Sequence, residues 1–350
     1  MAHKYQETKD LFKIIWKSTI LFIVISFLST AIFSYLPFPW GDYQVNTKFS
    51  YLKDKQLDPN VYFLGSSITN RQIIPSVFDS VVNDPNLLSF NLASDGKMLP
   101  YPFQELEYLL AQDSTIKYVF LELDGFTYLN PKHIFTTNGI YNITPKWYTF
   151  SMTNLWFGSS IIIKNKIGMT GRYTYAIIAN MLKIGMRKDI IKAHLETNKW
   201  DYEILERSGM GHLTFDSLFT ADKFQIENKT AIINETKSEY QQAIKKLHLG
   251  LKLDENKVQN YLLKWYVKYA QSHGTQLVYV INPRKSVLLS IEQSINIKSI
   301  LPAKNVIEIA DPDKYPELYN EDYRWDSGHL NIKGAQLFSQ YCAKEFNRIK

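Results

Sequence analysis

The sequence predicts an α/β protein built on a parallel sheet of about five strands, with one N-terminal transmembrane helix. Short apolar runs alternate with amphipathic helical patterns, and the runs begin near residues 61, 87 and 116, the pitch of repeated strand-helix-strand units. Before them, Ser18–Leu36 provides nineteen uncharged, mostly apolar residues, close to the ~20 that cross a bilayer. A hydrophobic content of 45% in 350 residues is sufficient for a sizeable core.

The N-terminal segment is expected to anchor the chain with its N-terminus in the cytoplasm. Residues 1–17 contain Lys4, Lys9, Lys13 and Lys17, and Trp40 follows the apolar stretch as an interfacial aromatic residue. A cleaved signal peptide is the alternative, but the stretch exceeds the usual length of about 7–15 residues and no Ala-x-Ala site closes it. We therefore expect a single-pass protein of the inner (cytoplasmic) membrane, with residues 37–60 as a linker and residues 61–350 in a periplasmic or extracellular domain.

The domain alternates between strand and helix in two blocks. The first block has predicted strands over Val61–Leu64, Leu87–Ala93 and Ile116–Asp124, and predicted helices over Pro75–Val82 and Tyr101–Gln112. The second has a helix over Asp254–His273, with Asp254 as its cap and Gly274 as its stop, then strands over Gln276–Ile281 and Val306–Ala310 around a helix near Ser286–Ile300. This alternation indicates a doubly wound, flavodoxin-like sheet.

Residues 125–253 interrupt this pattern as a large, mostly helical insertion between the third and fourth strands. The insertion leaves the sheet at the carboxyl end of a strand, where the loops of open α/β sheets build ligand sites. Within it, Leu155–Gly185 is rich in aromatic and aliphatic residues. We interpret that stretch as a small helical subdomain with its own core; the alternative is a surface that rests on the membrane or on a membrane partner.

Composition argues against several classes of function. The chain has 40 Lys and Arg against 34 Asp and Glu and no dense basic run, so no nucleic-acid partner is expected. Cys342 is the only cysteine, which rules out an intramolecular disulfide and a cysteine-rich metal site. We expect neither a metal nor a cofactor.

The first strand is followed by Gly65, Ser66 and Ser67, which predict a nucleophile. Glycine permits a sharp turn, and a serine just beyond it can expose its hydroxyl at the edge of the sheet. The competing interpretation is that both serines only cap the next helix. Ser67 becomes the preferred nucleophile because of a second motif near the C-terminus.

That second motif is Asp326-Ser327-Gly328-His329, just before the last predicted helix. His329 can take the proton of Ser67 and return it to a leaving group, while Asp326 orients the imidazole and stabilises its cation. The alternative is a turn with a surface histidine. We predict that the three side chains converge at the carboxyl edge of the sheet.

Other candidates lie at the ends of neighbouring elements. After the second strand, Gly96 can present a backbone N–H to an oxyanion together with that of Ser67, or it can simply be a turn glycine. Asn91, Asp124 and Arg324 are candidates for binding substrate, although Asp124 can equally serve only to end its strand.

These residues resemble the motifs of the SGNH/GDSL hydrolase superfamily. The likeness covers Val61–Asp124 and Gln276–Lys350, and it implies Ser67 as the nucleophile, His329 and Asp326 as the rest of a triad, and Gly96 as an oxyanion donor. Two positions depart from the pattern. Ser66 stands where aspartate is usual, and Asp124-Gly125 replaces the Gly-x-Asn-Asp block that supplies another oxyanion donor.

The departures and the single anchor resemble the membrane-anchored acyltransferase branch, which includes the D-alanine transfer protein of teichoic-acid modification and alginate-type O-acetyltransferases. The resemblance implies a membrane-bound O-acyltransferase as partner. We expect an extracytoplasmic serine-dependent O-acyltransferase or deacylase that acts on an envelope glycan or another acyl acceptor. The alternatives are a plain carbohydrate or lipid esterase and a non-catalytic, membrane-tethered accessory protein.

Overall fold

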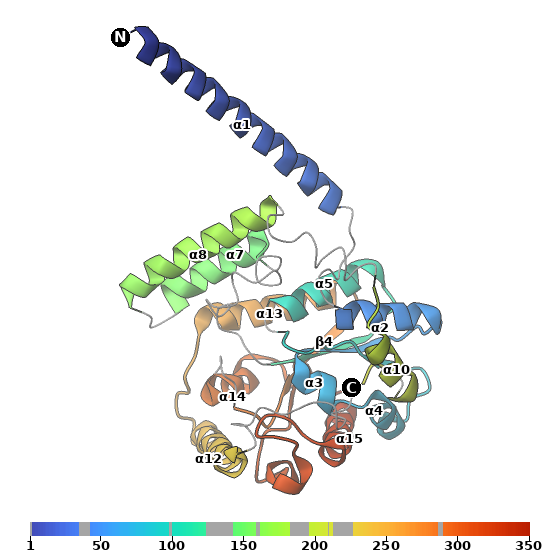
Figure 1. Cartoon of the computed structure of the whole chain (residues 1–350). Helices are drawn as coiled ribbons and strands as arrows, with labels where there is room; N and C mark the ends of the chain where they lie inside the picture. The colour runs from blue at the N-terminus through green and yellow to red at the C-terminus, as the bar shows by residue number, and fades with distance from the viewer. Residues whose placement is uncertain are drawn as a thin grey trace.

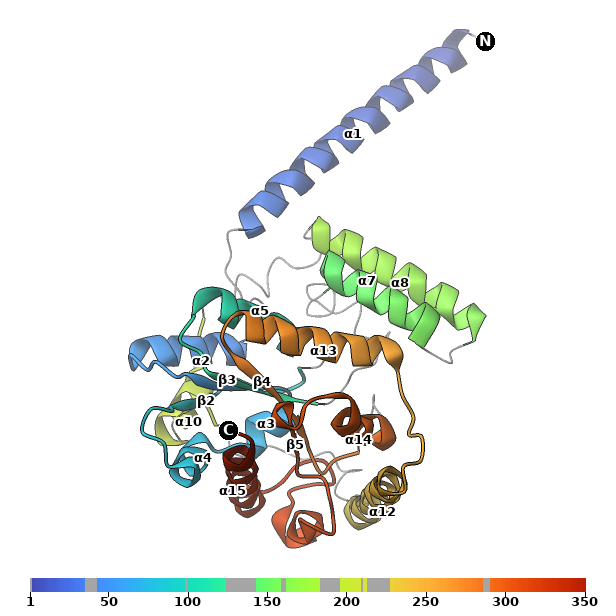
Figure 2. The same cartoon turned by 180° about the vertical axis from the view of Figure 1, so that it is seen from behind.

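Five parallel strands form the centre of the domain in a computed structural model that describes residues 2–34, 43–97, 100–123, 143–158, 162–182, 196–208, 210–212, 227–285 and 290–350 (Figures 1 and 2). The strands are β1 (Val61–Leu64), β2 (Ser89–Asn91), β3 (Tyr118–Glu122), β4 (Gln276–Ile281) and β5 (Val306–Glu308). Their order in the sheet is β2-β1-β3-β4-β5. The chain therefore moves outward from β1 to β2 and then returns past β1 to β3, and a doubly wound sheet binds its ligands at such a switch point.

Three of the predicted strands are shorter than the sequence suggested. Leu87–Ala93, Ile116–Asp124 and Val306–Ala310 contribute three, five and three paired residues respectively. The central strand β1 has only four residues. A strand pairs only where a neighbouring strand lies beside it. The apolar residues that flank each paired segment are therefore buried without joining the sheet.

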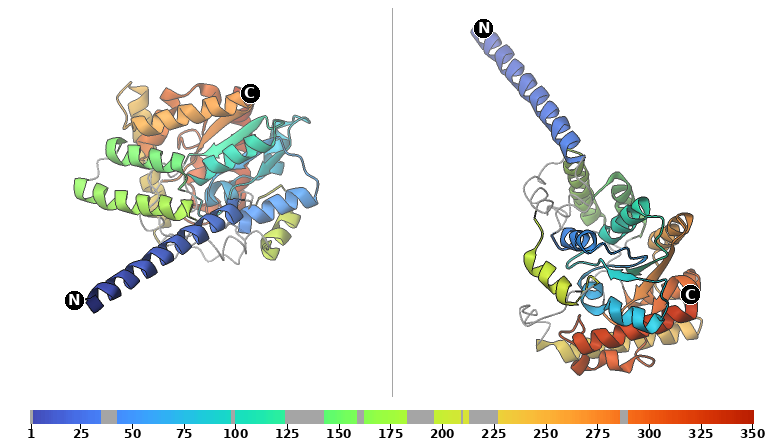
Figure 3. Two further views of the ribbon diagram at one scale, coloured as in Figure 1. Left: turned by 90° about the horizontal axis from the view of Figure 1, so that it is seen from above. Right: turned by 90° about the vertical axis from the view of Figure 1, so that its right-hand side faces the viewer.

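Helices cover both faces of the sheet. On one face lie α4 (Pro75–Val82) and α15 (Ile332–Ile349), which pack against each other; the other face carries α2 (Tyr43–Asp54), α5 (Tyr101–Gln112) and α13 (Lys257–Ser272) (Figures 1 and 3). The short helix α3 (Ser67–Gln72) follows β1 directly. The remaining short helices are η2 (Ala303–Asn305), η3 (Pro316–Tyr319) and η4 (Glu321–Tyr323).

Aromatic side chains fill the core on each face. Beneath α4 and α15, the rings of Phe63, Phe78 and Phe120 lie with centroids 4.8–5.3 Å apart. On the opposite face, Phe103 of α5 stacks on Tyr266 of α13 at 3.9 Å. These contacts fix the two helical layers on the sheet and hold the ends of its strands in place.

The chain between β3 and β4 contributes most of the remaining helices. They are α7 (Pro145–Thr153) with its extension η1 (Asn154–Gly158), α8 (Ile163–Met181), α10 (Lys199–Ser208), α12 (Lys229–His248) and α13. We call α7, η1 and α8 the hairpin; it lies over the α5 and α13 layer (Figure 2). Helix α12 packs against α14 (Ile291–Ile300). Within the predicted insertion, residues 125–142, 159–161, 183–195, 209 and 213–226 lie outside the described residues.

Two sequence predictions about local structure are wrong. The expected linker over residues 37–60 contains α2, whose Val45, Thr47 and Lys48 are fully buried. The lysine among these buried residues conceals the amphipathic pattern of α2 in the sequence. The helix expected from Asp254 begins at Lys257, because the side chain of Asn256 accepts from the first free N–H groups and caps it.

The N-terminal helix α1 (Ala2–Ser34) projects away from the domain (Figures 1 and 3). Its segment Lys9–Leu28, with a mean hydropathy of 2.0 and little burial, is long and apolar enough to cross a membrane, a test that a signal sequence also passes. The helix extends N-terminal to Ser18, the first residue of the predicted span. Residues 2–17 contain no glycine or proline, so nothing ends the helix before its first turn at Ala2.

Candidate active site

Ser67 occupies the turn between β1 and α3, at the carboxyl edge of the sheet. Ser66 is the N-cap of α3, and its hydroxyl accepts a hydrogen bond from the N–H of Ile68 at 3.3 Å. Ser67 is the first residue of the helix. The capping role left open for both serines therefore belongs to Ser66, and the Ser67 hydroxyl is available for another partner.

The carboxylate of Glu122, the last residue of β3, holds this turn from the neighbouring strand. Oε1 accepts from the Ser66 hydroxyl at 2.8 Å, while Oε2 accepts from the N–H of Ser66 (2.8 Å) and from the N–H and hydroxyl of Thr69 (3.2 and 2.8 Å). Glu122 is 4% exposed, so these four donors compensate its burial. A Cβ on Gly65 would lie 2.5 Å from the same carboxylate, which explains the glycine.

Glu122 was missed from the sequence. Its signal is a single acid in the otherwise apolar run of residues 118–123. Asp124, the last residue of the predicted strand, was the only carboxylate of this strand considered from the sequence, either to bind substrate or to end the strand.

Asp326 and His329 lie on a tight loop between η4 and α15. An antiparallel bridge between Arg324 and Leu330 closes the loop. Inside it, Oδ1 of Asp326 accepts from the N–H groups of Gly328 and His329 at 2.7 Å each. The loop thereby presents the carboxylate to the imidazole that follows it.

The structure brings Ser67, His329 and Asp326 together, as their positions in the sequence predict. Oγ of Ser67 is 2.9 Å from Nε2 of His329, and Nδ1 of His329 is 3.0 Å from each oxygen of Asp326. A carboxylate only accepts, so Nδ1 carries the proton and Nε2 is left to accept from the Ser67 hydroxyl. Burial acts to raise the pKa of Asp326, but hydrogen bonds from His329 and Gly328 hold it below its ordinary value.

This arrangement has the geometry for nucleophilic catalysis. An ionised Asp326 stabilises the imidazolium that forms when His329 takes the serine proton. The His329 side chain remains 18% exposed and that of Asp326 only 7%, so the base is accessible while its partner is shielded. Acyl transfer requires this pattern of access.

The loop after β2, which carries Gly96, lies beside the Ser67 turn. The N–H of Ser94 donates to the carbonyl of Gly65 at 3.2 Å, and Asp95 pairs with Arg71 of α3. Gly96 has a φ of 69°, which favours glycine, and a Cβ there would meet open space. The turn interpretation of Gly96 is therefore confirmed, and its part as an oxyanion donor stays a prediction.

A buried lysine connects this loop to α3. Nζ of Lys48, on α2, donates to Oδ1 of Asn70 at 2.7 Å, to the carbonyl of Asn91 at 3.0 Å and to the carbonyl of Ala93. Burial lowers the pKa of Lys48 to about 7, although the Asp95 carboxylate opposes the shift. No sequence signal singled out Lys48, because its helix was taken for a linker.

Asn91 supports the frame of the site and does not face a substrate. It is fully buried, and its amide donates to the carbonyls of Thr69 at 2.8 Å and Ile73 at 2.9 Å. Its expected contact with substrate is therefore corrected: the amide joins the end of β2 to α3.

Arg324 is likewise a supporting residue. Its guanidinium donates to the carbonyls of Leu318 (2.7 Å), Pro283 (2.7 Å) and Ser327 (3.1 Å), and burial lowers its pKa to about 10. The expected substrate contact does not fit this interior position; the side chain braces the Asp326 loop. Asp124, the third candidate for binding substrate, lies outside the described residues.

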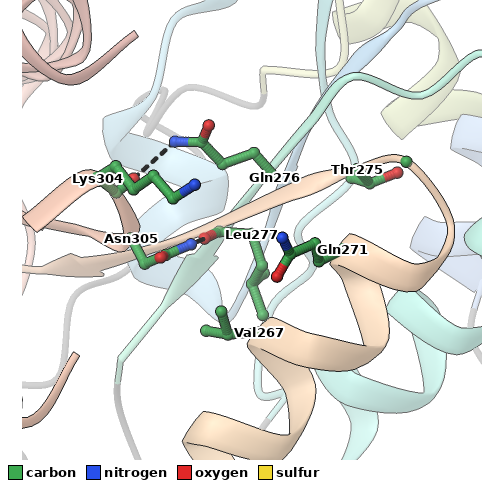
Figure 4. Close-up of a pocket in the computed structure, with 8 residues that line it drawn as sticks. Val267, Gln271, Thr275, Gln276, Leu277, Lys304 and Asn305 are labelled. Atoms are coloured by element: carbon green, nitrogen blue, oxygen red, sulfur yellow. Dashed lines mark hydrogen bonds between the residues drawn. The ribbon is translucent and has the colours of Figure 1, made fainter. Parts of the chain in front are cut away.

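A pocket elsewhere in the domain is unrelated to the triad. Figure 4 shows it between α13, the start of β4 and η2, lined by residues that include Val267, Gln271, Leu277 and Asn305. It opens at the amino end of β4, whereas Ser67 lies at the carboxyl edge. Over the described ranges, no group of three His, Cys, Asp or Glu side chains is placed to hold a metal.

No protein-family model matches the chain, and no curated protein matches it. Any functional conclusion therefore depends on the residues themselves and on their geometry. The strongest geometric observation is the series of hydrogen bonds from Ser67 through His329 to Asp326.

Proposed function

We propose that this protein is an extracytoplasmic serine-dependent O-acyltransferase or deacylase that acts on a cell-envelope glycan through an acyl-enzyme. One observation carries the proposal: Ser67 Oγ lies 2.9 Å from His329 Nε2, and the opposite ring nitrogen lies 3.0 Å from the Asp326 carboxylate. A serine capping a helix needs no such partners, whereas a nucleophile does.

The reaction would proceed in two steps. In the first, Ser67 Oγ attacks the acyl carbonyl and His329 takes its proton; the tetrahedral oxyanion is received by the N–H groups of Ser67 and Gly96, and His329 protonates the departing alcohol. In the second, a water or a sugar hydroxyl attacks the acyl-serine, its proton passes to His329, and Ser67 leaves as a hydroxyl. Water yields deacylation and a sugar yields transfer.

Similarity to the SGNH/GDSL superfamily supports this assignment. The strand order β2-β1-β3-β4-β5 supports a flavodoxin-like sheet, and the helices described between β3 and β4 support a helical insertion in it. Ser66 departs from the usual aspartate of that superfamily. In this chain Glu122 provides a carboxylate to the same turn, so the departure does not argue against catalysis.

The site of action follows from the N-terminus. With α1 as an uncleaved anchor and the lysines before it in the cytoplasm, the domain lies outside the inner membrane, where envelope glycans are modified. A membrane-bound O-acyltransferase would be the source of acyl groups. A plain carbohydrate or lipid esterase would use the same residues and differ only in its acceptor.

A fluorophosphonate probe tests the proposal on the full chain. We expect labelling of the wild type and of Ser66→Ala, and none of Ser67→Ala. If the folded wild-type protein does not react, the acyl-enzyme is refuted and the accessory-protein alternative takes its place. Acyl transfer is then separated from hydrolysis by supplying an acylated donor with and without glycan and measuring acyl-glycan against free acid.

A further inference from the structure

We propose that the outer face of the hairpin rests on the surface of the anionic lipid bilayer that holds α1. This face comprises Trp156, Phe157, Ile162, Ile163, Ile167 and Ile178, and we refer to it as the hairpin face. The proposal depends on α1 being a membrane anchor, but it does not depend on catalysis by Ser67.

Exposed apolar side chains are concentrated in the hairpin. Among the described residues outside α1, twelve large hydrophobic side chains are exposed, and eight of them lie between residues 156 and 181. Phe157 is 85% exposed, Ile163 70% and Ile167 61%. Such a concentration of exposed apolar side chains marks a protein or membrane contact.

The periodicity of α8 separates this face from a second apolar face. At 3.6 residues per turn, Ile163, Ile167, Ile178 and Met181 fall within about 60° around the helix. Its buried side chains point elsewhere: Met169, Tyr173 and Ala176 form a small core with residues of α7 and η1. One apolar face therefore stabilises the hairpin, and the other stays exposed among the residues that the structure describes.

The hairpin is mounted firmly on the domain. Trp147 of α7 stacks against Phe103 of the main core, with centroids 5.7 Å apart. Asn154 of η1 accepts a hydrogen bond from the buried amide of Asn256 at 2.9 Å. The hairpin face is thus held in a fixed orientation that points away from the sheet.

Charge favours anionic lipid over a protein partner of mixed charge. No Asp or Glu occurs between residues 125 and 188, although the chain has 34 of them in 350 residues. Lys164 is exposed on α8 beside the apolar stripe, and Arg172 is exposed farther around the same helix. Apolar residues bordered by cations and free of carboxylates are typical of helices that lie in the interface of an anionic membrane.

The position of α1 brings the hairpin face within reach of a bilayer. In Figures 1 and 2, α1 leaves the domain on the same side as α7 and α8. Residues 29–42 join the end of the candidate span to α2, and even a fully extended chain of that length covers no more than about 50 Å. The tether therefore keeps the domain, and with it the hairpin face, close to the bilayer that α1 would enter.

Three isoleucines of nearly equal exposure provide a matched test. They are Ile23 in α1 (46% exposed), Ile178 in the hairpin face (50%) and Ile332 at the start of α15 (49%). Each would be changed to cysteine in the full chain, labelled with an environment-sensitive fluorophore and reconstituted in nanodiscs of phosphatidylcholine and phosphatidylglycerol with a lipid-borne quencher. The native Cys342 is fully buried and stays unlabelled.

We expect strong quenching at Ile23→Cys, quenching at Ile178→Cys about twofold or more above that at Ile332→Cys, and weaker quenching at Ile178→Cys in purely zwitterionic discs. Equal and weak quenching at Ile178→Cys and Ile332→Cys overturns the proposal. The hairpin face would then be the contact site of a protein partner, which is missing because the disc holds this chain alone. Equal quenching of Ile178→Cys in both kinds of disc refutes the anionic preference. Absence of quenching at Ile23→Cys refutes the anchor and the docking together, while fluorophosphonate labelling of Ser67 is unaffected.

Discussion

Ser66 and Ser67 are adjacent and chemically identical, yet their surroundings separate them. Ser66 is engaged as a helix cap and as a donor to Glu122, whereas Ser67 meets His329. The difference arises from a single step along the chain at the start of α3. It provides a matched pair of substitutions within one turn.

Ser67→Ala should abolish acylation of the envelope glycan and leave stability unchanged, because it removes one half-exposed hydroxyl and no core volume. A loss of about a thousandfold or more in kcat is expected, since knockout of a nucleophile leaves only binding and the oxyanion site. Ser66→Ala should retain activity but lose about 1 kcal/mol of stability through its cap. The measurements are glycan acyl content in complemented cells and thermal unfolding of both variants. Wild-type acylation by Ser67→Ala would contradict the enzymatic proposal.

Lys48 should give the domain a distinctive dependence on pH. Its pKa is lowered to about 7 by burial, whereas an unfolded lysine titrates near 10.5. Between these values the unfolded state binds more protons, so the free energy of unfolding should rise with pH by up to about 1.4 kcal/mol per unit. Below pH 7 both states are charged and the slope vanishes.

Denaturant unfolding of wild type and Lys48→Met between pH 6 and 10 checks this, with the exposed Lys53→Met on the same helix as control. We expect the difference in free energy of unfolding between wild type and Lys48→Met to change steadily above about pH 7. The corresponding difference between wild type and Lys53→Met should not vary with pH. Parallel curves for all three proteins would show that Lys48 keeps an ordinary pKa.

Among the secondary-structure elements, the junction of β1, α3 and β3 determines where the nucleophile stands. Glu122 accepts four hydrogen bonds from the first turn of α3. A negative charge at a helix N-terminus also interacts favourably with the helix dipole. The position of Ser67 therefore depends on Glu122, which holds the turn from the neighbouring strand.

Glu122→Gln should lower kcat about 10- to 100-fold with little change in KM. The NH2 group of glutamine would face the N–H and hydroxyl donors of the turn, so the turn would move and shift the Ser67 hydroxyl. Glu308→Gln is the matched control: Glu308 also ends a strand and its side chain is only 7% exposed, but it bonds to Lys298 at 3.2 Å. Steady-state kinetics on a small ester separate the two. If Glu122 only supported the fold, Glu122→Gln and Glu308→Gln would lose stability alike and both would keep their kcat.

At the scale of the whole molecule, the proposals assign to α1 and the hairpin the side of a membrane on which the site operates and its distance from that membrane. Alkaline phosphatase fused after Trp40 should be active, because the lysines before the span retain the N-terminus in the cytoplasm. A fusion after Lys9, before most of the apolar segment, should be inactive. The reverse pattern would place the domain in the cytoplasm and exclude envelope glycans as substrates.

The local elements were predictable from sequence because they depend on neighbours in the chain. The periodicity of Pro75–Val82 and Tyr101–Gln112 predicted both helices with the bounds the structure has. The apolar runs predicted all five strands, although not their paired lengths. Ser67, Asp326 and His329 were identifiable because each lies in a short motif at the end of an element.

What the tertiary structure alone decided concerns residues that act across the sheet. Glu122 and Lys48 have no motif, since the partners of Glu122 lie 53 to 56 residues away along the chain and those of Lys48 lie 22 to 45 residues away. Asn91 and Arg324 looked suited to a substrate, but packing turns their donors toward buried carbonyls. Sequence thus determined the elements and the reacting side chains, which follow from local pattern; only folding decided which polar groups hold the site, because burial and hydrogen bonding depend on contacts distant in the chain.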